Sequence, residues 1–156
     1  MYKMPDIPAD VEVRRLQPQH LSEWVLIEEA TFPEPWSESQ LAGFLEKTRY
    51  QCFGLFQLNR LLAFCVFTTV LDEAELLQIA VMPAEQGRRL AERLFLLSAE
   101  KLRAEHVGKV LLEVRVSNSP ALQLYKRLGF SEDGVRTGYY PTATGREDAL
   151  LMSLSI

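Results

Sequence analysis

Cysteine and histidine are scarce in this sequence, and the residues of each type stand apart from one another. Cys52 and Cys65 lie in apolar stretches without metal-ligand spacing, and His20 and His106 have no partner motif. This scarcity argues against a zinc site or a disulfide framework and favours two buried thiols in a reducing compartment. The sequence also lacks a Walker motif, a nicotinamide or flavin fingerprint and a Ser-His-Asp pattern, so the corresponding enzyme classes are not indicated.

Long apolar runs are missing as well. No stretch approaches the roughly 20 apolar residues that span a bilayer, and residues 1–9 contain no apolar core of a signal peptide. We therefore expect a cytoplasmic protein without a membrane partner. An excess of positive charge is also absent, because the net charge is -4 and the pI about 5.3. A broad nucleic-acid-binding face is thus not expected.

The length and composition are those of one globular domain. The 156 residues are 47% hydrophobic and 24% charged, which is enough apolar material for a real core. We expect residues 1–9 to form a flexible tail and residues 10–156 to form the domain. The acidic balance is compatible with a basic peptide substrate, although acidic surfaces that only face solvent are far commoner.

Hydrophobic periodicity predicts an alternation of strands and helices. Strands are expected at 11–14, 50–57, 61–71, 76–81, 110–116, 130–137 and 149–156, with 50–57 and 61–71 forming an antiparallel hairpin. Helices are expected at 19–30, from Ser37 with a capping box to Gln40, from Leu90 to a stop at 106–108 with Gly108 as the stop residue, and at 121–128, closed by Gly129. A long connection is expected at 138–148. This order predicts an α/β fold of the mixed-sheet type with helices on both faces.

One strand-to-helix junction carries the clearest functional signal. Residues 76–81 form an apolar run that ends at Pro83, and a short polar loop containing Gly87 then leads into the helix that starts at Leu90. The first turn of a helix has unpaired backbone amides that can bind an anion. In sheets of this kind, ligands bind at the carboxyl ends of strands where neighbours separate. The alternative is a turn without any ligand.

Several stretches resemble the GNAT family of acetyl-CoA-dependent N-acetyltransferases. The resemblance covers nearly the whole chain after residue 10, and it is carried by the order of elements, the loop after Val81-Met82-Pro83 and the segment from Asn118 to Phe130 (NSPALQLYKRLGF). It implies a mixed, mostly antiparallel sheet of about seven strands. Three stretches narrow it to the subgroup that acetylates the N-terminal alanine of the eighteenth protein of the small ribosomal subunit: LDEAEL at 71–76, LEVRVSN at 112–118, and YYPT at 139–142 with GREDA at 145–149.

The resemblance implies acetyl-CoA as co-substrate and no metal. It assigns the thioester contacts to the backbone of one strand, the pyrophosphate contacts to the loop amides, and a further coenzyme contact to a helix cap. These residues are Ile79, Ala80 and Val81 in the strand, Gln86, Gly87, Arg88, Arg89, Leu90 and Ala91 in the loop, and Asn118 at the cap. Capping alone would also explain Asn118.

The loop departs from the family pattern Q/R-x-x-G-x-G/A at its central glycine. Gln86 and Ala91 match, but Arg89 stands where the pattern has glycine. Glycine lets the backbone approach a phosphate closely, whereas arginine adds a Cβ and a phosphate-binding charge. We hypothesise reduced affinity for the coenzyme, which near-normal binding of acetyl-CoA would refute.

Two catalytic residues follow from the resemblance. Glu113 is expected to take the proton of the acceptor amine through water, and Tyr125 is expected to protonate the leaving thiolate. An α-amino group has a pKa near 8, against roughly 10.4 for lysine, so an N-terminal acceptor needs only a modest base. A surface carboxylate and a packed aromatic remain the structural alternatives for these two residues.

The acceptor is expected to be the basic N-terminal peptide of a ribosomal protein. The candidates for its cleft are Trp36, Asp72, Glu73, Tyr139 and Tyr140, each of which is singly more typical of a loop aromatic or a solvated charge. Two other functions stay open: an acetyltransferase acting on lysine or a small amine, and a GNAT-fold binding module that has lost catalysis. Arg89 supports the binding module, whereas retention of Glu113 and Tyr125 argues against it.

Overall fold

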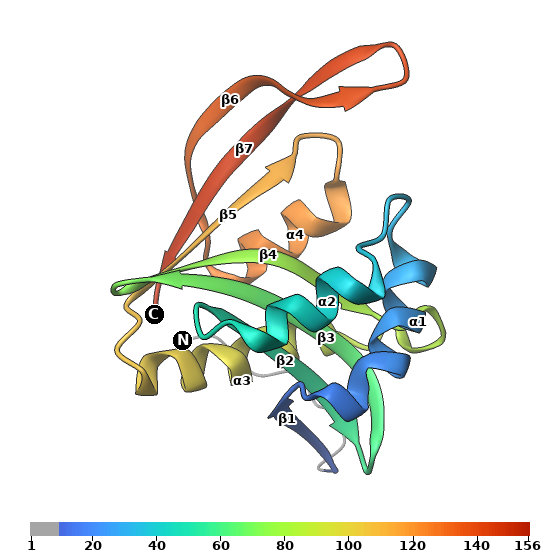
Figure 1. The fold of residues 1–156 in the computed structure, drawn as a ribbon. Coiled ribbons are helices and arrows are strands. Elements are labelled where there is room, and N and C mark those ends of the chain that lie inside the picture. Colours follow the sequence, from blue (N-terminus) through green and yellow to red (C-terminus); the bar gives the residue numbers. More distant parts are fainter. Residues whose placement is uncertain (1–9) are drawn as a thin grey trace.

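The computed structural model describes residues 10–156, so the expected tail at 1–9 lies outside the described residues. Figure 1 shows a central sheet with helices on both sides. The strands are β1 (Val11–Arg15), β2 (Tyr50–Gln57), β3 (Arg60–Val70), β4 (Glu73–Val81), β5 (Lys109–Arg115), β6 (Ser131–Thr142) and β7 (Gly145–Ser155). The α-helices are α1 (Leu21–Thr31), α2 (Glu38–Glu46), α3 (Leu90–Ala104) and α4 (Ser119–Leu128), and two short 3-10 turns occupy Pro18–His20 and Pro83–Glu85.

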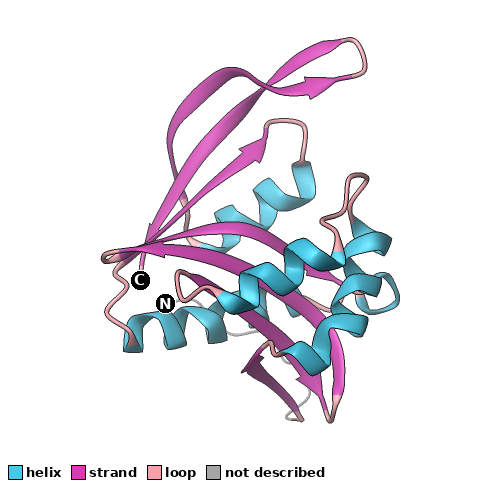
Figure 2. Cartoon of the chain, viewed as in Figure 1, coloured by secondary structure: helices cyan, strands magenta, loops and turns pink. Residues whose placement is uncertain are grey.

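The seven strands form one sheet in the order β1-β2-β3-β4-β5-β7-β6. Every neighbouring pair is antiparallel except β4 and β5, which are parallel because α3 crosses over between them. The predicted mixed and mostly antiparallel sheet is thereby confirmed, as is the hairpin of β2 and β3. Figure 2 shows the same alternation of strands and helices.

The parallel pair β4–β5 is joined over a short length only. Glu73 to Glu75 pair with Lys109 to Leu111, and no later residue of β4 pairs with β5. In Figure 1 the two strands start together and then diverge, with α4 in the space between them. A register shift of β4 against β3, beside Gln78, accompanies the divergence and is typical of a bulge that bends a strand. The sheet therefore opens at the carboxyl end of β4.

Two hydrophobic cores cover the two faces of the sheet. On one face α3 and α4 bury a cluster that includes Phe67, Leu94, Phe95 and Tyr125. On the other face α1 and α2 bury a second cluster, which includes Trp24, Leu41 and Phe64. The helical spacing that we used to predict these elements thus corresponds to buried faces.

Three helix ends agree with the sequence and one does not. Ser37 and Gln40 form the predicted capping box, Asn118 caps α4 by accepting a hydrogen bond from the Ala121 amide at 3.3 Å, and Gly129 ends α4 in the left-handed region. The stop of α3 was assigned to the glycine at 108, but His106 takes the left-handed conformation there, with φ 68°. The helix ends at Ala104, so the left-handed position that follows it is residue 106, two residues before Gly108.

The prediction of a long connection at 138–148 is wrong. β6 runs to Thr142 and β7 starts at Gly145, so the strands form a continuous hairpin that projects beyond the rest of the sheet (Figure 1). Pro141 is tolerated because β6 is an edge strand whose outer side needs no donor. Arg146 supports the hairpin through hydrogen bonds to the carbonyls of Gly138 (2.5 Å) and Tyr139 (3.1 Å). Within residues 10–156, no helix is long and apolar enough to cross a bilayer.

Candidate active site

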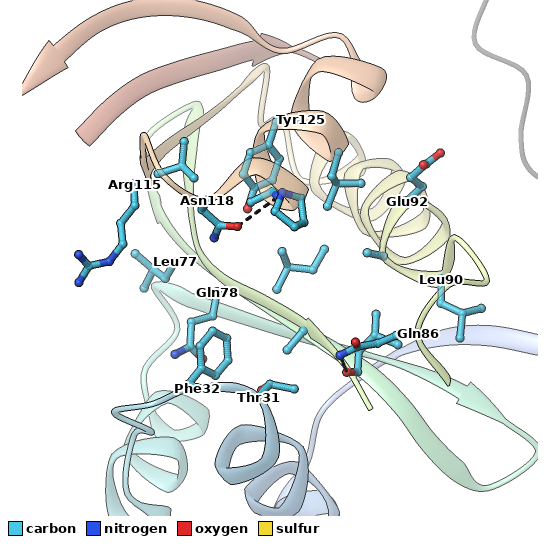
Figure 3. A pocket seen from close by; sticks show the side chains of 18 of the residues that line it. Thr31, Phe32, Leu77, Gln78, Gln86, Leu90, Glu92, Arg115, Asn118 and Tyr125 are labelled. Carbon is cyan, nitrogen blue, oxygen red and sulfur yellow. Dashed lines mark hydrogen bonds between the residues drawn. The ribbon is translucent and has the colours of Figure 1, made fainter. Parts of the chain in front are cut away.

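A cleft of about 770 Å³ lies where β4 and β5 separate. Its walls come from the second half of β4, the loop before α3, the end of β5, the start of α4, and the segment after α1. Figure 3 shows side chains from these elements around the opening, including Gln78, Gln86, Asn118 and Tyr125. The junction that the sequence singled out therefore lies at the cleft, at the position expected for a ligand site in such a sheet.

The exposed edge of β4 offers backbone groups to this cleft. The Met82 amide donates to the carbonyl of Leu62 on the β3 side. Because backbone groups of successive residues in a strand point to opposite sides, Val81 and Ile79 present theirs to the opening. The Gln86 side chain donates to the Val81 carbonyl at 3.1 Å, which leaves amide donors at this edge as the groups suited to polarise a carbonyl oxygen.

Two residues of the loop before α3 have left-handed backbone conformations. Gly87 has φ 83° and Arg89 has φ 58°. Glycine accepts such values without strain, whereas a residue with a Cβ pays about 1–2 kcal/mol. The loop thus requires two left-handed positions and has one glycine for them. Exchanging Gly87 and Arg89 would only move the backbone strain to position 87. The single change Arg89→Gly removes the strain at residue 89 without creating it elsewhere, so it is the better test of how this loop binds the coenzyme.

Arg89 is held by a fully buried carboxylate. Its Nη2 lies 2.8 Å and its Nε 3.2 Å from the two oxygens of Glu92, and Arg127 of α4 donates to the same carboxylate at 2.6 Å. The Glu92 side chain has no exposed surface, while the two arginines are about half exposed. All three residues line the cleft. The cluster joins the start of α3 to α4 and leaves a net positive charge at the cleft wall.

Glu113 lines the cleft from the outer end of β5, and it has a cationic neighbour. Arg136 of β6 lies 3.2 Å from its carboxylate, and the Arg136 guanidinium stacks over Tyr139 at 5.3 Å. Glu75 of β4 is the second carboxylate in this area. Its pKa is raised, first by burial and then by the charge of Glu113, while Arg136 lowers it.

Tyr125 also lines the cleft, from α4. Burial raises the pKa of its hydroxyl to about 12, with smaller contributions from Tyr140 and Cys65. The hydroxyl therefore stays protonated at any physiological pH. A donor of this kind can hydrogen-bond to a developing thiolate, although a thiol of pKa about 8.5 would not take the whole proton at equilibrium.

Most of the predicted coenzyme residues meet at the cleft. Those lining it are Ile79, Ala80, Val81, Gln86, Gly87, Arg89, Leu90, Ala91 and Asn118. Arg88 is the exception, because it does not line the cleft and its side chain is paired with Glu85.

The predicted acceptor residues are scattered. Tyr140 lines the cleft and lies under the guanidinium of Arg115 at 4.3 Å, and Tyr139 packs against it at 4.9 Å. Trp36 does not line the cleft, since its ring packs edge-on against Phe44.

Asp72 and Glu73 lie at the far end of β4 from the cleft. Glu73 pairs with Lys109 where β4 and β5 are still joined. At about 3.3 Å per residue, Glu73 is roughly 13 Å along the strand from Leu77, the first residue of β4 that lines the cleft. Neither Asp72 nor Glu73 therefore lines the cleft.

Several residues around the cleft were not foreseen. They are Glu75, Arg115, Arg136, Glu92 and Arg127, together with Glu28 and Gln78. The spacing of three between Arg89 and Glu92 at a helix start could have indicated their pairing. The remaining contacts join strands or helices that are distant in the sequence, and no local pattern predicts them. Within residues 10–156, no group of three or more potential metal ligands is found.

Comparison with known proteins identifies the family. The model for the acetyltransferase (GNAT) family matches residues 21–130, which is more than half of the chain. This chain belongs to the GNAT family. Members of the family use acetyl-CoA, which agrees with a cleft that offers helix-start amides, cationic side chains and a free strand edge.

Relatives of this GNAT chain cover most of its length. It is 42% identical over 130 residues to the [ribosomal protein bS18]-alanine N-acetyltransferase of Escherichia coli K12, covering 83% of this chain and 87% of that protein. A putative enzyme of the same description from Bacillus subtilis is 34% identical, covering 92% and 95%. The crystal structure of the ribosomal-protein-S18-alanine N-acetyltransferase of E. coli superposes with a TM-score of 0.85 at 39% identity, covering 94% of each chain.

Proposed function

We propose that this protein transfers an acetyl group from acetyl-CoA to the N-terminal α-amine of a protein, with the N-terminal alanine of ribosomal protein bS18 as the acceptor. The observation that carries the proposal is the cleft between β4 and β5, which Glu113 and Tyr125 line from two different elements. The relatives described above support the choice of acceptor.

In the proposed mechanism, the coenzyme's pyrophosphate binds the amides from Gly87 to Ala91, where the dipole of α3 favours negative charge. Amides of β4 at Ile79 and Val81 polarise the thioester carbonyl. Gln86 supports this edge by occupying the Val81 carbonyl. The coenzyme's position thus depends on backbone groups, and side chains act mainly at the two ends of the cleft.

The proposed chemical step is a direct transfer. Glu113 accepts, through water, the proton of the acceptor amine; the nitrogen–carbon bond forms and the carbon–sulfur bond breaks. Tyr125 donates a hydrogen bond to the sulfur as negative charge develops on it, and the proton that the thiolate finally takes up comes from solvent, so that Tyr125 stays protonated. No cysteine is placed to form an acetyl-enzyme, since Cys52 and Cys65 do not line the cleft.

A peptide assay tests this function. The protein is incubated with acetyl-CoA and a peptide that starts with alanine and continues with basic residues, including lysine, and the product is fragmented in a mass spectrometer. One acetyl group on the α-amine is expected. Acetyl on the lysine side chain would instead indicate the alternative acceptor, and absence of product with intact acetyl-CoA binding would favour a binding module.

The specificity of the assay is controlled in two ways. The same peptide with a blocked N-terminus should give no product, because it keeps the lysine and loses only the α-amine. Glu113→Gln should lower kcat by about 10²-fold, the usual contribution of a general base, without loss of acetyl-CoA binding. Unchanged turnover in Glu113→Gln would overturn the role of this carboxylate.

A further inference from the structure

Glu28, in the last turns of α1, is a fully buried carboxylate without a cationic partner. It has no exposed surface, and it is absent from the ion pairs found among residues 10–156. Its Oε1 accepts hydrogen bonds from the Trp36 amide at 2.9 Å and from Nε2 of Gln78 at 3.0 Å, while its Oε2 bonds to no described group. A buried polar group with incomplete hydrogen bonding costs free energy. A role beyond stability is therefore the natural explanation for a carboxylate at this position.

The two donors to Glu28 belong to two different elements of the cleft wall. Trp36 ends the proline-containing loop after α1, whose first residues, Phe32 and Pro33, line the cleft. Gln78 also lines the cleft, lies beside the bulge of β4, and directly precedes the strand edge proposed to hold the thioester. Figure 3 shows Gln78 and Phe32 among the side chains that line the cleft. One carboxylate thus ties the loop after α1 to β4, two neighbouring parts of the cleft wall.

The hydrogen bond to Glu28 sets the orientation of the Gln78 side-chain amide. The Gln78 amide directs its Nε2 toward the accepting Oε1 of Glu28, while its own Oε1 is buried and bonds to no described group. Side-chain rotation of Gln78 and movement of the loop are both restricted by the same two bonds. Both are centred on Oε1 of Glu28, and a change at this atom alone should release the loop from β4.

We propose that Glu28 is a positioning residue that sets the loop at residues 32–36 against β4 and thereby sets where the acceptor meets the thioester. The proposal rests on the proposed function. Glu28 does not line the cleft, and it acts through Trp36 and Gln78. A displacement of about 1 Å between reacting groups can cost on the order of 10²-fold in rate, so a small shift of this loop is enough to be measured.

Two substitutions of Glu28 separate this role from a merely structural one. Glu28→Leu removes both hydrogen bonds, whereas Glu28→Gln keeps an oxygen that can accept from the Trp36 amide. We expect Glu28→Leu to lower kcat/KM for the alanine-led peptide by at least about tenfold while the Kd for acetyl-CoA stays within about twofold. Glu28→Gln should restore kcat/KM to within about threefold of the unaltered protein.

Glu29→Gln is the matched control, because Glu29 is the next residue of α1 and is exposed. It should leave both constants unchanged. If Glu28→Leu does not fold, Gln78→Met gives the second test, since it removes the link to β4 but keeps the Trp36 bond. It should lower kcat/KM for the peptide without weakening acetyl-CoA binding.

The outcomes distinguish the two proposals. Unchanged kcat/KM in Glu28→Leu, or in Gln78→Met where the leucine variant does not fold, would overturn the positioning role. A parallel loss of acetyl-CoA affinity and melting temperature would overturn it as well, because that result indicates general damage. Failure of the unaltered protein to acetylate any peptide would instead overturn the proposed function, and the positioning role with it.

Discussion

Arg89 has a left-handed backbone and places its guanidinium on both oxygens of the buried Glu92 carboxylate. The family pattern has glycine at this position, where such a backbone costs nothing. The ion pair offsets part of the strain, and Arg127 from α4 binds the same carboxylate. The loop therefore keeps the left-handed geometry at residue 89 even though it has lost the residue type that favours it.

Arg89→Gly should make acetyl-CoA bind more tightly. The change removes the Cβ that hinders approach of a phosphate, so we expect Kd to fall. The backbone strain of about 1–2 kcal/mol is already present in the unliganded protein, so its removal should raise the free energy of unfolding and not the affinity. Isothermal titration calorimetry measures this directly. Arg88→Gly is the matched control, because Arg88 is the neighbouring loop arginine and does not line the cleft. Weaker binding by Arg89→Gly would show that the guanidinium holds the coenzyme.

Glu92→Gln should destabilise the protein. Two arginines lose their charged acceptor, and hydrogen bonds to charged groups contribute about 1.5–3 kcal/mol. We expect a loss of this order in the free energy of unfolding, measured with urea. Glu100→Gln, on the exposed side of the same helix, should change stability by less than about 0.5 kcal/mol. Equal stability of the two variants would contradict a structural role for the cluster.

Tyr125→Phe should lower kcat by about 10²-fold and leave the KM for the peptide nearly unchanged, since only a transition-state hydrogen bond is lost. The pH dependence gives a second check. Because burial raises the Tyr125 pKa to about 12, the hydroxyl is protonated throughout the usual assay range. Any fall in kcat between pH 8 and about 10 must come from another group and should persist in Tyr125→Phe. Disappearance of that fall in the variant would assign the titration to Tyr125.

The two cysteines should be inert in the folded protein. Burial raises the pKa of Cys52 and of Cys65 to about 12, so both are thiols rather than thiolates at pH 8. We expect no labelling by a thiol reagent in native buffer and labelling of both after denaturation. Intact mass after incubation with acetyl-CoA alone should show no acetyl-enzyme. A stable acetylated cysteine would contradict direct transfer.

The sequence predicted the elements that have strong local signals. Alternation and apolar periodicity located the strands and helices, and Ser37, Asn118 and Gly129 marked helix ends because capping is a local interaction. The outer part of the β6–β7 hairpin, at residues 138–148, was predicted to be a loop because the sequence Tyr139-Tyr140-Pro141 is typical of a loop when the partner strand is unknown. Its pairing depends on β7 and on Arg146, which follow later in the chain.

In the candidate site, too, the sequence predicted residues in local motifs and missed contacts between distant segments. The resemblance located Glu113, Tyr125 and the loop from Gln86 to Ala91, since these lie in recognisable motifs. Contacts such as Arg136 with Glu113, or Glu28 with Gln78, join residues that are 23 and 50 positions apart. The resemblance made Asp72 and Glu73 candidates for the acceptor cleft, but neither residue lines it, because they lie at the start of β4 and the cleft lies along its second half.

The central claim is that the opening between β4 and β5 holds acetyl-CoA despite Arg89, and calorimetric titration of the unaltered protein with acetyl-CoA tests it most directly. We predict saturable binding at one site per chain, tightened by Arg89→Gly and unaffected by Arg88→Gly. Absence of saturable binding in the unaltered protein and in Arg89→Gly alike would contradict the account.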